Sequence, residues 1–400
     1  MNKIIKSYYQ SKILFWNTIR SEWKAINRDK AVIEIFLSIT MVILLAYTYI
    51  YSNQVVQKIP VAVVNQDATK LSRDYIAMLN ASDGIKVVTT ITDLQKAKIA
   101  YYENKVRGIL IIPKYFEENI RSGKQTTITT FSDASNMLFY KQVLGTISTI
   151  NGYFNAGIVI KKEMTHGKSY KQAIENYTSI KTISNSLFNI SGGYATYLIP
   201  MLTALIIQLV LLMGIGLING TQNEELTMKF NFPESLHKGR ITPVLFGKAV
   251  LYSLLFLVII PIQIGIVYTM FSIPVRSSLF TIYIFTIPYV FSIVFLGIAI
   301  SSFFNKREDV LLFIILTSIP SLMLSGLSFP AQGFSIFYKI LAQFIPSTSG
   351  IDGFVKLTQM KASFFEVFPE WIKLWLLACL YFILAFISLK LRLHKKLKTI

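Results

Sequence analysis

The sequence predicts an α-helical polytopic membrane protein with six transmembrane helices and an inserted extracytoplasmic α/β domain. Apolar runs long enough to cross a bilayer recur along the chain, and four of them follow one another between Thr196 and Phe334. Hydrophobic residues make up 53% of the chain and charged residues 15%, which is typical of a membrane protein. Because lipid offers no hydrogen-bond partners, runs of about 20 apolar residues cross it as helices. Residues 52–195 lack such a run.

Residues 1–30 are expected to form a cytoplasmic amphipathic helix that leads into the first span, residues 31–51. Apolar side chains recur there at spacings of three and four, which marks one face of a helix. This face contains Ile13, Trp16, Ile19, Trp23 and Ile26. A basic helix of this kind suits a membrane surface, and it either only fixes the orientation of the first span or also contacts a partner. The first span is expected to act as an uncleaved signal anchor.

In residues 52–195, strand and helix patterns alternate, which predicts an α/β layer. The expected strands are IPVAVVN, IKVVTTI, VRGILIIP and TTITTF. Helices are expected between them over residues 72–80, 93–103 and 114–122, with Asp93 as the N-cap of the second. A longer helix from Asn136 to about Lys162 follows, and residues 180–189 are expected to return to the membrane in an extended conformation.

The remaining spans are expected at residues 196–218, 243–271, 279–303, 310–328 and 371–389. Residues 219–242 are expected to form a polar cytoplasmic coupling loop, and residues 390–400 a basic cytoplasmic tail. Residues 331–370 are moderately apolar but interrupted by glycine and proline. We expect short re-entrant helices there, which dip into the bundle without crossing it, because protein can cover their backbone.

Basic residues next to the spans predict the topology. They occur in the N-terminal helix, in the coupling loop, in the 305–309 turn and in the tail, so all four are expected on the cytoplasmic side of a bacterial inner membrane. Six spans return both termini to that side and place residues 52–195 outside. The formal net charge of +19 fits the anionic cytoplasmic leaflet, and no basic helix alternates with aromatics as nucleic-acid binding would require.

The sequence carries no pattern typical of an enzyme. One cysteine, Cys379, rules out a disulfide within the chain and a zinc site made of thiolates. The histidines are too scattered for metal ligation: His166, His237 and His394. Three acids of the 52–195 domain lie at turns and caps, where acids are usually solvated: Asp67, Asp74 and Asp133. We therefore expect no catalytic, cofactor-binding or metal-binding residues and no cofactor in this chain.

The spans carry almost no ionisable residues. Glu34 lies near the cytoplasmic end of the first span, close enough to the interface to reach water. Gln208 and Gln263 are the main polar residues further inside. A carrier driven by protons or sodium normally has ionisable groups at the membrane midplane. If this chain moves a substrate, a partner must supply the work.

Several stretches, taken in chain order, resemble ABC-2 type permeases, the membrane subunits of ABC exporters of the drug- and polysaccharide-efflux class. They are SEWKAINRDK before the first span, IPVAVVNQDATKLSRDYI and VRGILIIPKYFEENIRSG in the 52–195 domain, SLFNISGGYATYLIP, SIPVRSSL, LSGLSFP and FIPSTSGIDGFVKL. The resemblance covers nearly the whole chain and includes the large external domain that bacterial members carry between the first two spans. The coupling loop departs from the family pattern, because it keeps Thr242-Pro243 and Gly247-Lys248 but lacks a Gly-Thr pair.

The resemblance implies a half-transporter in which two permeases, either two copies or two paralogues, sit on two cytoplasmic ABC ATPase subunits. The residues implied in coupling to the ATPase are Arg28, Asp29, Glu224, Glu225, Thr227, Phe230, Phe232, Pro233, Gly247 and Lys248. The residues of the fifth-span and re-entrant motifs are Ser325, Gly326, Phe329, Pro330 and Pro346. The aromatic residues of the coupling loop either insert into an ATPase groove or lie on the membrane surface.

The expected function is export of a small hydrophobic or amphipathic molecule, with ATP hydrolysis on a separate subunit. A periplasmic adaptor and an outer-membrane channel are further candidate partners for the 52–195 domain. The alternative is a membrane anchor that transports nothing and whose outer domain binds a ligand or a surface partner. An anchor needs neither a structured coupling loop nor re-entrant helices, so these two features distinguish the two functions.

Overall fold

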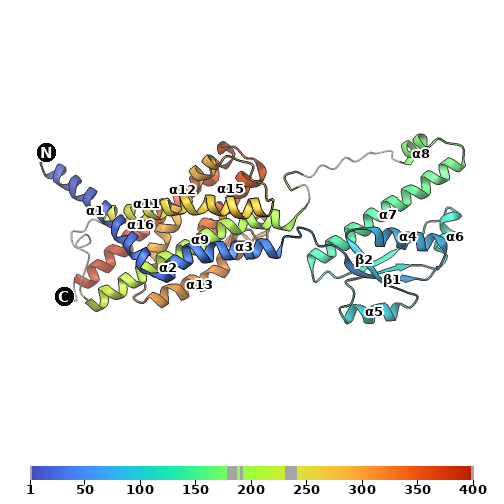
Figure 1. Ribbon diagram of the computed structural model, residues 1–400, viewed down its shortest axis with the longest axis horizontal. Coiled ribbons are helices and arrows are strands. Elements are labelled where there is room, and N and C mark those ends of the chain that lie inside the picture. Colours follow the sequence, from blue (N-terminus) through green and yellow to red (C-terminus); the bar gives the residue numbers. More distant parts are fainter. Residues whose placement is uncertain (1, 178–186, 190–191, 230–240, 398–400) are drawn as a thin grey trace. The chain divides into compact units, whose positions relative to one another are not determined.

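The computed structural model describes residues 2–177, 187–189, 192–229 and 241–397. The chain divides into a helical unit, Met1–Gln54 with Ser186–Ile400, and an α/β unit, Val55–Asn185 (Figure 1). The α/β unit is therefore an insertion in the helical unit. Its two connections lie side by side, because the Tyr194 amide donates a hydrogen bond to the Gln54 carbonyl over 2.6 Å. The predicted fold class, a polytopic helical membrane protein with an inserted α/β domain, is confirmed.

The α/β unit contains a four-stranded sheet in the order β2-β1-β3-β4, in which β1 pairs parallel with β2 and β3 while β4 runs antiparallel to β3. Its elements are β1 (Ile59–Asn65), α4 (Lys70–Ala81), β2 (Ile85–Ile91), α5 (Leu94–Tyr102), β3 (Gly108–Ile112), α6 (Phe116–Arg121), β4 (Thr129–Ser132), α7 (Met137–Thr165) and α8 (Tyr170–Tyr177). Asp93 caps α5 by accepting a hydrogen bond from the Gln95 amide, as predicted. Helix α8 was not predicted. Of the expected extended return, residues 180–186 lie outside the described part of the chain.

Strand β1 lies at the centre of this unit and is buried on both faces. Alternate residues such as Val61 and Val63 contribute to the core under α4, α6 and α7, while Ala62 and Val64 contribute to the core under α5. A strand buried on both faces is typical of a parallel sheet covered by helices on both sides. This explains why IPVAVVN is continuously apolar rather than alternating.

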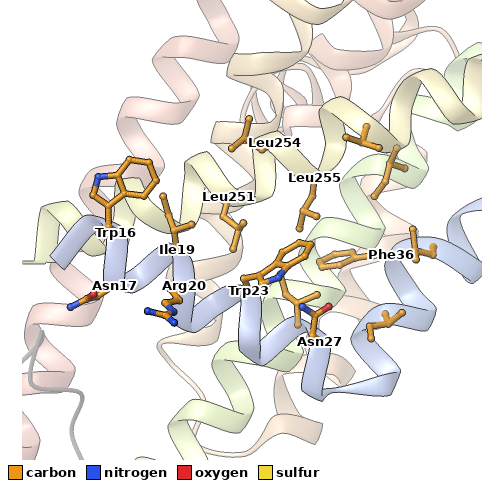
Figure 2. Close-up of a pocket in the computed structure, with 15 residues that line it drawn as sticks. Trp16, Asn17, Ile19, Arg20, Trp23, Asn27, Phe36, Leu251, Leu254 and Leu255 are labelled. Atoms are coloured by element: carbon orange, nitrogen blue, oxygen red, sulfur yellow. The ribbon is translucent and has the colours of Figure 1, made fainter. Parts of the chain in front are cut away.

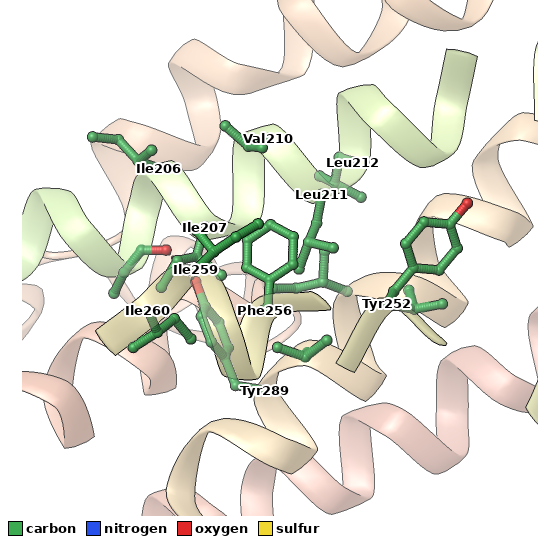
Figure 3. Close-up of a cluster of buried hydrophobic side chains, with 14 of the residues drawn as sticks. Ile206, Ile207, Val210, Leu211, Leu212, Tyr252, Phe256, Ile259, Ile260 and Tyr289 are labelled. Carbon is green, nitrogen blue, oxygen red and sulfur yellow. Dashed lines mark hydrogen bonds between the residues drawn. The ribbon is translucent and has the colours of Figure 1, made fainter. Parts of the chain in front are cut away.

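The described helices of the helical unit are α1 (Asn2–Arg28), α2 (Lys30–Ile33), the π-helical turn η1 (Glu34–Ile39), α3 (Thr40–Ile50), α9 (Tyr194–Lys229), α11 (Ile241–Gln263), the π-helical turn η2 (Ile264–Tyr268), α12 (Leu279–Ser301), α13 (Arg307–Leu324), η3 (Ala331–Gly333), α14 (Ile336–Gln343), α15 (Pro346–Met360), η4 (Phe364–Val367) and α16 (Phe368–Leu397). Helix α9 is central and packs against α3, α12, α13 and α15. Figure 3 shows its contact with α11, where Ile207 and Leu211 lie beside Phe256, and with Tyr289 of α12. The Tyr289 hydroxyl donates a hydrogen bond to the Ala204 carbonyl over 2.6 Å.

Length and apolar composition alone select six described helices as able to cross a membrane, and this set differs from the predicted spans at one place. It includes α7 but not α13, the predicted fifth span. Helix α13 has only 18 residues, of which the first three, Arg307, Glu308 and Asp309, are charged. The two helices differ in the core against which they pack. Val143 and Ile147 of α7 belong to the core of the α/β unit, whereas α13 packs in the helical unit against α9.

Two helices continue beyond their predicted spans. Helix α9 runs on to Lys229, so the first half of the predicted coupling loop, residues 219–229, is helical. Residues 230–240 of that loop lie outside the described part of the chain. Helix α16 extends to Leu397 through most of the predicted tail. Neither extension contains a proline, which would remove a backbone N–H from the helix, so the backbone hydrogen bonds continue past the predicted membrane boundary.

Residues 331–370 hold four short elements, η3, α14, α15 and η4, before α16 begins. Helix α15 starts deep beside α9, because the Ser347 amide in its first turn donates a hydrogen bond to Gln208 Oε1 over 2.7 Å. Two glycines allow α15 to approach α12 closely. A Cβ added at Gly353 would lie 2.1 Å from the Phe285 ring, and one at Gly350 would lie 2.5 Å from the Tyr289 ring.

Candidate functional site

A cluster of buried polar side chains joins α1 to the membrane helices at one end of the helical unit. The end of α9, the start of α11, the turn before α13 and the end of α16 all lie at this end (Figure 1). Helix α1 packs along α11 with Thr18, Glu22 and Ile26 buried, at a helical spacing of four. Gly247 of α11 allows this approach, because a Cβ there would lie 3.0 Å from both the Phe15 carbonyl oxygen and Thr18 Cβ.

Glu22 of α1 and Lys248 of α11 form a buried ion pair, with Lys248 Nζ 3.0 Å from Glu22 Oε1 and side chains only 2% and 9% exposed. Lys248 also donates to Asn219 Oδ1 over 2.5 Å and to Gln222 Oε1 over 3.1 Å, both on α9. Glu22 in turn accepts from Gln222 Nε2 over 2.8 Å and from the Tyr252 hydroxyl over 3.0 Å. We call these five residues the elbow network. Each of the three donors of the lysine ammonium has a partner, as a buried cation requires.

A second ion pair joins the junction of α1 and α2 to α13. Arg307 Nη1 lies 2.6 Å from Asp29 Oδ2, and Arg307 Nη2 lies 3.3 Å from Asp29 Oδ1, so both arms of the guanidinium engage the carboxylate. Asp29 also caps α2 by accepting from the Ala31 amide over 3.1 Å. The amide of Arg307, at the first residue of α13, donates to Glu224 Oε1 of α9 over 2.7 Å. Glu224 therefore satisfies one of the free N–H groups at the start of α13.

We call the elbow network and the Asp29–Arg307 pair together the junction. Close packing and further hydrogen bonds extend it. A Cβ added at Gly220 of α9 would lie 2.7 Å from Arg307 Cα, so only glycine allows α13 to begin there. Asn223 of α9 donates to the Ser301 carbonyl over 3.0 Å. Arg392 of α16 donates to the carbonyls of Ser302 and Phe304, each over 2.8 Å. The described contacts therefore tie α1, α9, α11, α12, α13 and α16 together at one end.

The chemistry of this junction is mechanical rather than catalytic. Removing one partner of a buried ion pair leaves an uncompensated charge and costs about 3–5 kcal/mol, so the pairs hold the helices in one register. Within the residues that the structure describes, no group of three metal-ligating side chains is placed to hold a metal ion.

The structure brings together some of the residues implied in coupling. Asp29, Glu224, Gly247 and Lys248 all belong to the junction. Arg28 is exposed at the last residue of α1, where its positive charge faces the negative end of the helix dipole. Two further predicted residues lie on the last turns of α9: Glu225 and Thr227. Three lie outside the described residues: Phe230, Phe232 and Pro233.

The fifth-span and re-entrant motifs meet only in part. Ser325 caps α13, Gly326 follows with a φ of +84°, and Pro346 opens α15. The Thr348 hydroxyl donates to the Leu324 carbonyl over 3.4 Å, which brings the end of α13 to the start of α15. Two other residues of the motifs lie apart from this contact, in the turn around η3: Phe329, which is exposed and stacks on Phe334, and Pro330, which precedes η3.

Only part of the predicted apolar face of α1 packs in the bundle, because Ile26 is buried and Ile19 is partly buried against the core while the tryptophans are not. Trp16 and Trp23 are 58% and 46% exposed, whereas Glu22 is buried. Figure 2 shows both tryptophans beside α11, where they line an apolar groove of about 840 Å³ that also includes Leu251 and Leu255. The buried stripe of α1 lies beside the tryptophan stripe because the ion pair with Lys248 and the small Gly247 define the contact with α11.

Sequence reasoning missed Glu22 and Arg307 as functional residues. It also missed the residues of α9 that contribute side-chain amides: Asn219, Gln222 and Asn223. A signal for Glu22 was present, because it lies three residues after Ile19 and four before Ile26, within the apolar stripe. An acid on the apolar face of a helix needs a buried partner. No comparable signal identified its partner, because Glu22 and Lys248 lie 226 positions apart in the sequence and no spacing rule links them.

No curated protein matches the chain significantly. The family model described as "ABC-2 family transporter protein" matches residues 30–387, which extend from α2 through most of α16 and include the α/β unit. This match covers well over half of the chain. The protein therefore belongs to the ABC-2 family of transporter proteins and is a multi-pass membrane permease.

Proposed function

We propose that this permease exports a small hydrophobic or amphipathic molecule across the bacterial inner membrane, driven by two separate cytoplasmic ATPase subunits. The observation that carries the proposal is the junction built from the elbow network and the Asp29–Arg307 pair. A buried ion pair joins α1 to α11, and a partly buried ion pair joins the start of α2 to α13, at the end of the unit where α9 leads into the predicted coupling loop. A membrane anchor would not need such a junction.

The proposed mechanism is a movement of joined helices. Closure of the ATPase pair displaces the end of α9 and the start of α11. Because Lys248 holds Glu22, Asn219 and Gln222 together, α1 moves with them as one body. The spans beyond the junction then tilt, which shifts the population between inward-facing and outward-facing states. The π-helical turn η1 begins directly after α2, and such turns are sites where a helix axis can change.

The proposed orientation places the junction, and with it both termini, in the cytoplasm, with residues 52–195 outside. Its support is the density of basic residues at this end, including Lys24, Arg28, Lys30, Lys390 and Arg392. A second permease, either a copy or a paralogue, would complete the translocation path. A periplasmic adaptor with an outer-membrane channel would contact the α/β unit, and loss of export on deletion of residues 55–185 would support that contact.

The test is a mild-detergent purification of the tagged chain from its native host, with mass spectrometry and ATP hydrolysis measured on the eluate. We expect an ATP-binding subunit to copurify. Phe230→Ala in the predicted coupling loop should reduce its recovery about tenfold. The matched control is Phe365→Ala, a side chain 86% exposed at the other end of the helical unit, which should leave recovery unchanged. Recovery of outer-surface proteins alone, with no ATPase, would contradict transport and favour the anchor.

A further inference from the structure

The α/β unit contains a pocket that the transport function does not explain. It has a volume of about 450 Å³ and lies between α4, α6, the segment 123–128 and α7. Pockets of roughly 300–1,000 Å³ are the size that holds small organic ligands. Every lining residue belongs to the α/β unit, so the pocket is a property of that unit alone.

The inner wall of the pocket is aromatic. Phe116 and Phe154 are stacked with ring centroids 6.1 Å apart and 21° between their planes, and Tyr75 meets Phe154 edge-on at 5.0 Å. The Tyr75 hydroxyl donates a hydrogen bond to Asn151 Oδ1. Burial raises the pKa of Tyr75 well above its ordinary value, so this hydroxyl keeps its proton at neutral pH. The wall is therefore aromatic and uncharged at neutral pH.

The apolar lining continues from this wall toward the surface. Ile158 on α7 and Ile120 on α6 are each only half-buried, although both line the pocket. Apolar side chains that enclose a concave space without filling it leave room for an apolar group of a ligand. Burial of that group would release water from the wall and favour binding.

The rim of the pocket is cationic. Lys124 and Lys162 both line it and are exposed, and no acidic residue belongs to the lining. Lys162 Nζ lies close above the backbone at Gly123, because a Cβ built there would be 3.5 Å from it. Two acids of α6 and α7 are engaged elsewhere, and a third, Glu118 of α6, is exposed and does not line the pocket. Glu117 pairs with Arg121 over 2.5 Å, and Glu163 pairs with Lys168.

We propose that this pocket binds an amphipathic anion, whose apolar chain lies against Phe116 and Phe154 and whose carboxylate or phosphate group is held by Lys124 and Lys162. The net positive charge of the α/β unit also favours an anionic ligand. Residues 55–185 contain 17 Lys and Arg against 10 Asp and Glu, and this excess attracts anions toward the rim. An amphipathic cation would meet like charge at the rim. A fully apolar ligand would leave the two ammonium groups without a role.

The experiment uses the full chain in nanodiscs of neutral phosphatidylcholine and a decanoic acid that carries a diazirine at its apolar end. Ultraviolet labelling, mapped by mass spectrometry, should be saturable and should fall on α7 near Phe154. Lys124→Gln with Lys162→Gln should weaken the apparent affinity about tenfold, because both charge-assisted contacts are lost. The methyl ester of the same probe should be much less sensitive to this change.

Matched variants separate the pocket from general charge effects. Lys96→Gln with Lys98→Gln removes two exposed lysines from α5, on the other face of the sheet, and should leave labelling unchanged. Ile158→Trp should fill the pocket and abolish labelling by both the acid and the ester. Competition by phosphatidylglycerol in the nanodisc would identify a membrane lipid as the source of the anion, and competition by free dodecyl phosphate alone would identify a soluble one.

Labelling that does not saturate, or that is equal in the wild type and the Lys124→Gln, Lys162→Gln variant, would overturn the proposal. The measurement requires neither ATP nor a transport substrate. Its failure would therefore leave the permease function untouched, and failure of the permease function would leave the binding result standing.

Discussion

Two polar contacts on α9 differ in the chemistry they use. Near the end of the helix, Asn219 and Gln222 surround a buried ion pair between Glu22 and Lys248. About three turns or more earlier, Gln208 makes a neutral hydrogen bond to the start of α15. Charges cost far more to bury than amides, and most at the bilayer centre. Ion pairs are therefore used where helices end near water, and neutral amides hold the re-entrant helix deeper in the bundle.

The ion pair should be the more sensitive of the two contacts. We expect Lys248→Met to destabilise the helical unit by about 3–5 kcal/mol, because Glu22 is then left buried without its counter-charge. The denaturation midpoint of the purified chain in mixed detergent micelles measures this. The double variant Glu22→Leu with Lys248→Met should recover most of the loss, since neither charge remains. Equal losses of stability in the single and double variants would show that the pair stabilises the unit only by filling space and not through its charges.

Close backbone packing near the ion pair should give the next largest effect. Gly220→Ala places a methyl carbon 2.7 Å from Arg307 Cα, so α13 must shift. We expect this shift to lower the stability of the helical unit by about 1–3 kcal/mol. Gly265→Ala is the matched control, because a Cβ there meets nothing within 4 Å. The same denaturation assay compares the two variants. A Gly220→Ala variant as stable as the control would mean that α13 does not begin against α9.

The neutral contact should be weaker. Gln208→Leu leaves the Ser347 amide buried without an acceptor, and we expect a loss of about 1–3 kcal/mol. Gln263 provides a contrasting control. It is fully buried, and its side-chain amide has no hydrogen-bond partner within the described residues, so Gln263→Leu should be neutral or stabilising. If both substitutions have the same effect, Gln208 does not hold α15.

The smallest effect concerns the α/β unit, where carboxylates act as surface caps. Hydrogen bonds from the Leu71 amide and from Arg121 lower the pKa of Glu117. A lowered pKa in the folded state stabilises this unit at pH values above the ordinary glutamate pKa of about 4.3, and the contribution is lost as the pH falls through the folded-state pKa.

Hydrogen exchange at the Leu71 amide, corrected for the intrinsic rate, measures this contribution. At pH 7, Glu117→Gln should speed the exchange a few-fold, and Glu118→Gln should not. As the pH falls through the folded-state pKa of Glu117, the wild type and Glu117→Gln should converge. A difference between them that persists unchanged at low pH would contradict the role of the ionised carboxylate.

Much of the fold could be predicted from the sequence because its elements follow local rules. The strands of the α/β unit are short apolar runs between turn residues, and Asp93 is a cap at the expected place. Boundaries near the membrane surface were less predictable. Helix α9 passes through the polar residues after Ile218 because its hydrogen bonds continue and because Asn219 and Asn223 find partners on α11 and α12.

The junction could be predicted only in part. The sequence selected Asp29, Glu224 and Lys248 through family resemblance, but it did not indicate that they contact different partners. Arg307 occurs in a short basic turn, where its expected role was to mark the cytoplasmic side. Its contact with Asp29 depends on the packing of α13 against α9, which only the three-dimensional structure contains.

The central claim is that α1 and α11 move as one body when the ATPase acts, and a reversible cross-link between them tests it most directly. In a chain with Cys379→Ser, the pair Thr18→Cys and Gly247→Cys can form a disulfide, because a Cβ at 247 lies 3.0 Å from Thr18 Cβ and needs only a small opening to reach the usual 3.5–4.5 Å. In the complex with its ATPase, we expect ATP-coupled transport to be equal, within about twofold, in the oxidised and reduced states. Loss of transport on oxidation, with recovery on reduction, would show that α1 must slide on α11 and would contradict a rigid junction.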